Sequence, residues 1–240
     1  MLHFNSEKFD FWTIYESIKR FYPIGVKKDD SRMYYSYPGL KELEDRVVDN
    51  IHVDEHFNSR WENFTAIIQK ETGKEIIGTT YGQAPSFSSY VLLQSSSIDN
   101  LTRTKELHFF VSLTGPYYTV IGNDNSTVKI LESQYKGTSY LVVSPFLEYA
   151  DIFKLLCEKI EKQFIGFRFV PFEICTQTID GLDVRYSDEK LNRVFHALFN
   201  NHIDLNTLRY VGDNHYKYDD WIRDGYVDDG DSWTAFPPIQ

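Results

Sequence analysis

The sequence predicts an α+β fold, with a central, mainly antiparallel sheet flanked by helices at the N-terminus and in the C-terminal half. Apolar residues recur with helical spacing in about residues 1–60, and again in a mixed region of helix and strand over 144–201, whereas strand-like alternation is concentrated in 64–143. Strands that cluster in this way favour α+β over a doubly wound parallel sheet. No linker, repeat or break in composition divides the chain, so we expect a single domain over residues 1–240.

The first third of the chain is expected to contain two helices. Ser6 can cap the first, which ends at Pro23. Its apolar face consists of Phe9, Trp12, Ile18 and Phe21. The second helix follows Gly39 and has apolar residues at i, i+3 and i+4 spacing, namely Leu40, Leu43, Val47 and Ile51. The pattern of residues 54–61 is ambiguous, and a continuation of this helix is one interpretation.

The middle of the chain carries the strand-like segments. Residues 64–69 and 75–80 flank Thr72 and Gly73, an arrangement that suits a hairpin. Further strands are expected at 90–93, 107–113, 117–121, 128–131 and 140–143. Turns are expected at 114–116 and at 123–125, because Gly, Pro, Asn and Asp favour turns.

The C-terminal half combines helices with one strand. A helix is expected to begin at Ser144-Pro145. Its apolar face consists of Tyr149, Ile152, Phe153, Leu156 and Ile160. Residues 167–176 suit a strand, with Pro171 at an edge or bulge. Ser187 is expected to cap a last helix with an apolar stripe of Leu191, Val194, Phe195, Leu198 and Phe199. Residues 202–240 form an acidic, aromatic, loop-rich end.

The charge balance excludes some classes of partner. The chain has 35 acidic and 25 basic residues, a formal charge of −10. Phosphate backbones require a cationic face and anionic membranes repel an acidic protein, so we expect neither as a partner. A basic protein would be attracted. The aromatic share of 16% exceeds what a core needs, and Tyr and Trp are enriched at protein interfaces.

The cysteines and the N-terminus indicate the reducing interior of the cell. Cys157, in a helical pattern, and Cys175, in a strand-like run, are expected to be buried free thiols, because a disulfide framework needs more cysteines. Residues 1–22 lack the uninterrupted apolar region of a signal peptide, and no stretch of 18 apolar residues occurs. We therefore expect a cytoplasmic protein.

The sharpest local pattern for chemistry is His52-Val53-Asp54-Glu55-His56. On a continuous helix, histidines at i and i+4 share a face and could both ligate zinc. These five residues resemble the H-x-x-E-H motif of the inverzincin metallopeptidases, although the flanking residues depart from that family's pattern. The resemblance implies Glu55 as general base, with Glu132 as the third ligand. The favoured interpretation is a solvated acidic helix face with no metal and no cofactor.

The C-terminal segment has the composition of a protein-binding surface. Aspartates are interleaved with tyrosines and tryptophans from Leu205 to Gln240. Rings can anchor a basic partner while carboxylates steer its approach. The candidate contact residues are Asp219, Asp220, Trp221, Asp228, Asp229 and Trp233. The alternative is a loop-rich cover that packs its rings on the domain and leaves its acids in water.

The chain as a whole resembles bacterial immunity proteins, which bind and block a toxin. The likeness lies in its acidic, aromatic α+β make-up and in segments such as 216–221 and 228–233. It implies a non-enzymatic inhibitor that binds a basic toxin domain stoichiometrically. Two other functions stay open, a zinc-dependent hydrolase that uses His52, Glu55 and His56, and a non-catalytic scaffold or accessory subunit.

Overall fold

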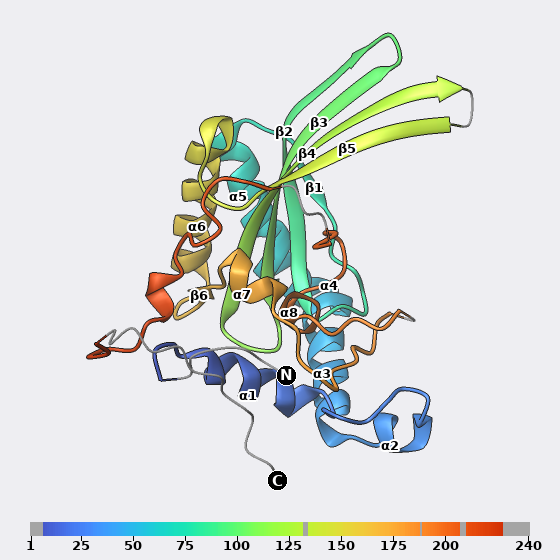
Figure 1. Cartoon of the computed structure of the whole chain (residues 1–240), viewed down its shortest axis with the longest axis vertical. Helices are drawn as coiled ribbons and strands as arrows, with labels where there is room; N and C mark the ends of the chain where they lie inside the picture. Colours follow the sequence, from blue (N-terminus) through green and yellow to red (C-terminus); the bar gives the residue numbers. More distant parts are fainter. Residues whose placement is uncertain (1–6, 132–133, 188, 207–209, 228–240) are drawn as a thin grey trace.

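A seven-stranded, mainly antiparallel sheet runs through the protein, in the order β1-β2-β3-β4-β5-β7 with β6 beside β4 (Figure 1). A computed structural model describes residues 7–131, 134–187, 189–206 and 210–227. The strands are β1 Ile76–Gly78, β2 Ser86–Ile98, β3 Leu101–Ser112, β4 Tyr117–Leu131, β5 Gln134–Val142, β6 Arg168–Phe169 and β7 Tyr210–Val211. Only the short β6 and β7 pair in parallel. Together with its helices, this sheet confirms the predicted α+β class.

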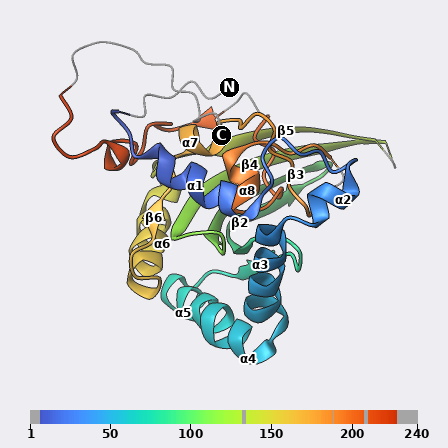
Figure 2. The ribbon, with the colours of Figure 1, turned by 90° about the horizontal axis from the view of Figure 1, so that it is seen from below.

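Helices cover both faces of the lower half of the sheet. They are α1 Phe11–Phe21, α2 Ser31–Tyr35, α3 Pro38–Val47, α4 Asp54–Phe57, α5 Asn63–Thr72, α6 Ala150–Gln163, α7 Phe172–Thr176 and α8 Val194–Leu198. Helices α5 and α6 bury one face of the sheet, whereas α1, α7 and α8 cover the other; α3 packs with α1 and runs from there towards α5 (Figure 2). The predicted apolar face of α6 is confirmed, because Phe153, Leu156 and Ile160 are buried. That of α1 holds in part: Ile18 and Phe21 are buried, whereas Trp12 is half-buried.

The predicted hairpin around Gly73 is wrong, because residues 63–72 form α5. The buried residues Trp61, Phe64 and Ile68 recur with helical spacing and pack under the sheet. Gly73 adopts the left-handed conformation (φ 63°) that ends a helix, so the glycine read as a hairpin turn is a C-cap.

The predicted turn at 123–125 is also wrong, since these residues lie in the middle of β4. They pair with β3 on one side and β5 on the other, so their backbone groups take part in two ladders. Their side chains are satisfied within the sheet: Asn123 Oδ1 accepts a hydrogen bond from Ser139 at 2.8 Å, and Asp124 pairs with Arg103 at 2.6 Å. Tertiary pairing has overridden the turn preference of Asn and Asp.

Two predictions in the C-terminal half hold only in part. Within 167–176, only β6 is a strand, and α7 begins immediately after Pro171. Cys175 therefore lies in a helix. The last helix, α8, has five residues, and Ser187 caps a local turn by accepting a hydrogen bond from the backbone N–H of Glu189 at 3.2 Å.

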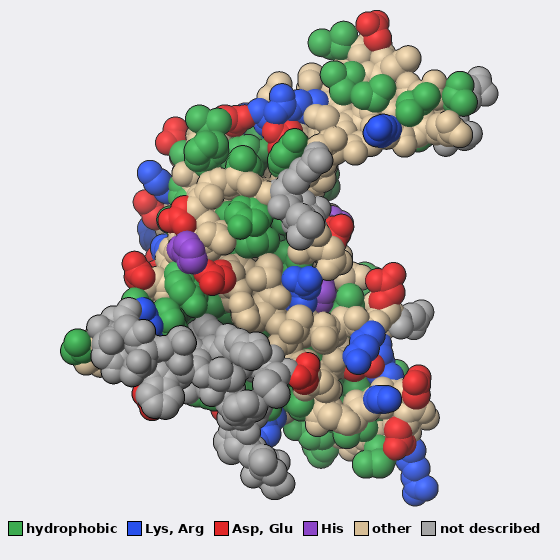
Figure 3. All heavy atoms as spheres, in the orientation of Figure 1, with side chains coloured by type: hydrophobic (Ala, Val, Ile, Leu, Met, Phe, Trp, Pro, Cys, Tyr) green, Lys and Arg blue, Asp and Glu red, His purple; other side chains and the backbone are tan. Residues whose placement is uncertain are grey.

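The upper half of the sheet projects beyond the helices. We call this projection the arm, and it comprises residues 94–104 of β2 and β3 and residues 124–131 and 134–140 of β4 and β5. A bulge between Leu92 and Gln94 marks the point where β2 leaves the body. Most arm residues are exposed or half-buried, in contrast to the buried lower halves of the same strands. A hollow separates the arm from the lower part of the molecule (Figure 3).

Candidate partner-binding surface

The C-terminal segment from Tyr210 to Val227 is pinned to the body by its rings. The ring of Tyr216 packs edge-on against Phe153 and Phe169, with centroids 5.3 and 5.4 Å away. The ring of Tyr218 lies 4.5 Å from that of Phe9. Trp221 is fully buried, so it is a core residue and is not available for contact with a partner. The expectation that Trp221 contacts a partner is therefore wrong.

Polar contacts hold the same segment in place. Lys217 forms an ion pair with Glu161 of α6 at 2.8 Å. Arg168 donates to the carbonyl oxygen of Asp220 at 2.9 Å, and its guanidinium lies 4.0 Å over the ring of Trp221. The same arginine pairs with Asp10 at 3.0 Å. These contacts come from α6, β6 and the start of α1, so the segment has little freedom to move relative to the body.

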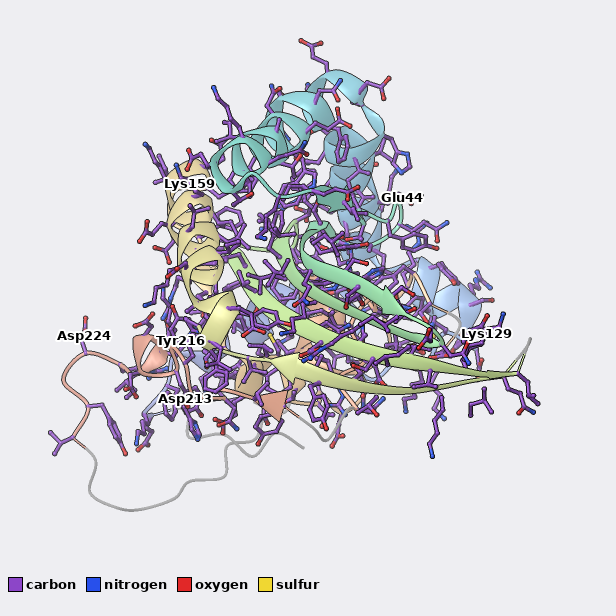
Figure 4. All side chains as sticks on the ribbon, turned by 90° about the horizontal axis from the view of Figure 1, so that it is seen from above. Glu44, Lys129, Lys159, Asp213, Tyr216 and Asp224 are labelled. Atoms are coloured by element: carbon purple, nitrogen blue, oxygen red, sulfur yellow. The ribbon has the colours of Figure 1, made fainter. Side chains whose placement is uncertain are left out.

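The carboxylates of the segment remain in water. Asp219, Asp220 and Asp224 are exposed, and within the described part of the chain no ion pair engages their carboxylates. Figure 4 shows Tyr216 beside α6, and it shows Asp224 on a loop that extends away from the body of the protein. Anchored rings with exposed acids match the expected cover, and Asp219 and Asp220 keep the exposure that a contact role requires. Asp228, Asp229 and Trp233 lie outside the described residues.

The two histidines of the metal-like pattern do not share a helical face. Val53 has an extended backbone (φ −89°, ψ 103°) that separates the helical turn Val48–His52 from α4. His52 Nε2 lies 2.7 Å from the carbonyl oxygen of Gly82, whereas His56 Nδ1 lies 2.9 Å from a carboxylate oxygen of Asp49. The assumption of a continuous helix is therefore wrong. Glu132 lies outside the described residues, and no metal-holding group of three or more His, Cys, Asp or Glu occurs among those described.

The cysteines are buried free thiols, as predicted. Burial raises the pKa of both Cys157 and Cys175 to about 12, so both stay protonated near neutral pH and are poor nucleophiles. His108 is buried, because helices cover both faces of this part of the sheet. Its Nε2 lies 3.0 Å from Glu106, and its ring lies 5.6 Å from that of His202.

The arm carries an exposed apolar row that the sequence reasoning missed. Ile98, Leu101 and Val128 are direct cross-strand neighbours on one face of the sheet. Their exposed fractions are 69%, 43% and 42%. More apolar residues are exposed nearby, namely Ile130, Leu131 and Tyr135. The available signal was that Ile98 and Leu101 flank Asp99-Asn100 within an otherwise polar stretch, which is too short a pattern to indicate an exposed row.

The opposite face of the arm is mostly polar, and Lys129 and Tyr135 lie on it near the tip. Because side chains alternate along a strand, the residues between the apolar ones point to the other side. They are Ser95, Ser97, Thr102, Thr104, Asn125 and Thr127, aligned across three strands. Ser97 and Thr102 share a hydrogen bond of 3.3 Å across the ladder. The arm therefore offers a hydrogen-bonding face on one side and, on the other, an apolar row beside the Arg103–Asp124 ion pair.

Comparison of the chain with protein-family models, with curated proteins and with solved structures found no match. Across the described ranges, no helix is long and apolar enough to cross a membrane.

Proposed function

We propose that this chain is a cytoplasmic inhibitor of the immunity kind, which neutralises a basic toxin domain by stoichiometric binding. The observation that supports this most is the arm, a projecting four-stranded sheet whose two faces are left uncovered by the chain's own helices. Exposed apolar side chains that form a contiguous patch mark interaction sites. A monomer gains little stability from such a projection, because it buries little apolar surface there.

The two faces of the arm suit the two parts of a protein interface. The row of Ile98, Leu101 and Val128 supplies apolar surface that a partner can dehydrate. The opposite face has the Ser, Thr and Asn composition of adaptable hydrogen-bonding surfaces such as antibody paratopes. We expect the slow dissociation of an inhibitor to come from contacts of the first kind.

The anchored acidic segment adds long-range attraction. Asp219, Asp220 and Asp224 are exposed and free of ion pairs within the described chain, so their field extends into solvent. Carboxylates in this state accelerate encounter with a basic partner and lose their effect as salt rises. We therefore assign the acids to the association rate, and the arm to the lifetime of the complex.

Two other functions remain as alternatives. A zinc-dependent hydrolase would require His52 and His56 to reorient from their present partners, Gly82 and Asp49. Stoichiometric zinc that is lost in a His52→Ala variant would favour it. A scaffold or accessory subunit would bind a partner in the same manner without neutralising an activity, so only a functional assay distinguishes it from an inhibitor.

The test is capture of a partner from native cells with the tagged chain, at low and at high salt, followed by mass spectrometry. One basic protein retained stoichiometrically at low salt is expected. The purified partner is then titrated with the chain in an assay of toxicity, where inhibition should be complete at one equivalent. Undiminished toxicity at full occupancy would leave the scaffold role, and recovery of the chain alone would contradict the proposal.

Variants locate the surface. Leu101→Asp places a charge in the apolar row and is expected to weaken capture by at least about tenfold, because a buried unpaired charge is costly. Ile165→Asp is the matched control, since Ile165 is 88% exposed in the loop between α6 and β6, outside the arm. Equal capture by wild type and Leu101→Asp would remove the arm from the interface.

A further inference from the structure

A pocket of about 590 Å³ opens between α3, the loop ahead of β2 and the loop after α7. It is separate from the arm and from the C-terminal segment, and neither contributes a lining residue. His52, the first histidine of the metal-like pattern, lies in its wall and contacts the carbonyl oxygen of Gly82. That contact ties α3 and its extension to the opposite loop, so two walls of the pocket are joined.

The interior of the pocket is apolar and aromatic. Leu40, Leu43 and Val47 of α3 contribute buried side chains to its lining. Four tyrosines complete the lining, namely Tyr22, Tyr35, Tyr81 and Tyr186. Tyr81 and Tyr186 meet edge to face with their centroids 6.5 Å apart. The volume and the lining are those of a site for a small molecule, whose flat ring could lie against tyrosine faces.

Two of the tyrosine hydroxyls are already used by the fold. Tyr22, at the base of the pocket, donates to the carbonyl oxygen of Ala197 at 3.2 Å, and Tyr186 donates to that of His196 at 2.8 Å. Tyr35 and Tyr81 are 54% and 47% exposed, and Tyr81 donates to Gln83 Oε1 at 3.3 Å. Polar recognition therefore falls to the groups at the rim.

Among the described residues of the lining, one acid and one base are fully charged, and they are paired. Arg185 donates to Glu44 Oε1 at 3.0 Å. This hydrogen bond lowers the pKa of Glu44, so its carboxylate is ionised near neutral pH. The pair has no net charge, yet it presents guanidinium N–H donors beside a carboxylate acceptor. A cationic ligand would be repelled by the guanidinium of Arg185, and an anionic ligand would be repelled by the carboxylate of Glu44.

From this geometry we infer that the pocket binds an uncharged, planar aromatic molecule that carries an amide-type edge. Its ring lies among the tyrosines and against Leu40 and Leu43. Its carbonyl oxygen accepts from Arg185, and its N–H donates to Glu44. The site is a small-molecule site independent of the proposed inhibitor surface, and its occupancy does not require the partner.

Three isosteric probes test the charge and the shape of the ligand together. Benzamide is neutral and has the donor and acceptor edge, benzoate is its anionic counterpart, and benzamidinium is its cationic one. Each is titrated into the full-length, isotope-labelled chain, and the amide signals of residues 81–83 and 44–48 are followed by NMR. For so small a probe we expect a benzamide dissociation constant on the order of 1 mM, at least about fivefold below that of either charged probe.

Three variants, one of them a control, locate the site, and none removes a buried side chain. Tyr81→Ala is expected to weaken benzamide binding by at least about fivefold, because it removes a stacking wall. Tyr135→Ala, a 62% exposed tyrosine on the arm, is the matched control and should bind as wild type does. Glu44→Gln leaves Arg185 unpaired, so the preference should move to benzoate.

Each outcome decides the inference. Preference of the wild type for benzamidinium or benzoate would overturn the neutral ligand class, and absence of shifts for all three probes would overturn the site. Equal binding by wild type and Tyr81→Ala would place the probe elsewhere. None of these results bears on capture of a protein partner, so failure here is distinguishable from failure of the proposed function.

Discussion

The indole N–H of Trp221 donates to the carbonyl oxygen of Phe169 at 2.8 Å, and this bond joins the C-terminal segment to β6 across 52 residues of sequence. The ring is fully buried between Tyr117 and the guanidinium of Arg168. Trp221 therefore fixes the position of the exposed aspartates beside it. Its contribution to any partner surface is indirect, since it holds Asp219 and Asp220 in place.

We expect Trp221→Ala to lower the free energy of unfolding by about 3–5 kcal/mol, because it opens a large cavity in the core. Trp221→Phe keeps most of the apolar volume but leaves the Phe169 carbonyl unpaired, at a cost of about 1–3 kcal/mol. Urea denaturation followed by circular dichroism measures both. Val227→Ala, at an exposed position of the same segment, should stay within about 0.5 kcal/mol of wild type. Similar stabilities for all four proteins would contradict the buried position of the ring.

Asp219→Asn combined with Asp220→Asn should leave stability unchanged and slow association with the basic partner by roughly threefold to tenfold at low salt. Stopped-flow mixing over a range of salt concentrations gives the rate and its salt dependence. The control removes two charges from α4 instead, by Asp54→Asn and Glu55→Gln, both exposed. If both double variants slow association equally, net charge is responsible and the C-terminal segment has no special role.

Gly122 lies where the arm leaves the body, and a Cβ there would come within 2.7 Å of Val142 Cβ and 2.9 Å of the Tyr149 ring. We expect Gly122→Ala to lower the free energy of unfolding by about 1–3 kcal/mol, because Tyr149 is buried and cannot move aside freely. Gly137→Ala is the matched control on the arm, where the nearest atoms would be 3.4 Å away. Thermal unfolding compares the two, and equal melting temperatures would mean that Tyr149 adapts.

Burial lowers the pKa of His196 from 6.5 to about 4, with a further contribution from Arg193. As the pH falls, the unfolded chain therefore binds a proton at this histidine at a higher pH than the folded chain does. Stability from this group is present above pH 6.5 and is lost as the pH falls towards 4, by roughly 3 kcal/mol in total. Urea denaturation at a series of pH values should show a smaller acid loss for His196→Leu than for wild type. An identical pH dependence in the two proteins would contradict a buried, neutral His196.

The sequence by itself determined the helices whose apolar faces meet the sheet. In α1 and α6 the helical period of apolar residues is long and uninterrupted, so local spacing and tertiary burial agree. It also determined the α+β class, the two buried thiols and the exposure of Asp219 and Asp220, since exposed acids need no partner to be stable.

Tertiary structure alone decided the features that depend on pairing over distance. Residues 123–125 have the local chemistry of a turn, but hydrogen bonding to two neighbouring strands holds them extended. Phe64 to Gln69 suits a strand by composition, but Ile68 reaches the core only if the segment is helical. Trp221 was read as a surface anchor because nothing local distinguishes a ring that binds a partner from one that binds its own fold.

The candidate surfaces follow the same division. Ile98, Leu101 and Val128 are ordinary strand residues in the sequence, and their exposure arises because α5 and α6 end before the sheet does. The pocket depends on Glu44 and Arg185, which are 141 residues apart and meet only after folding. Local spacing encodes which face of a segment is apolar, whereas the length of the covering layers decides whether that face is buried or offered to a partner.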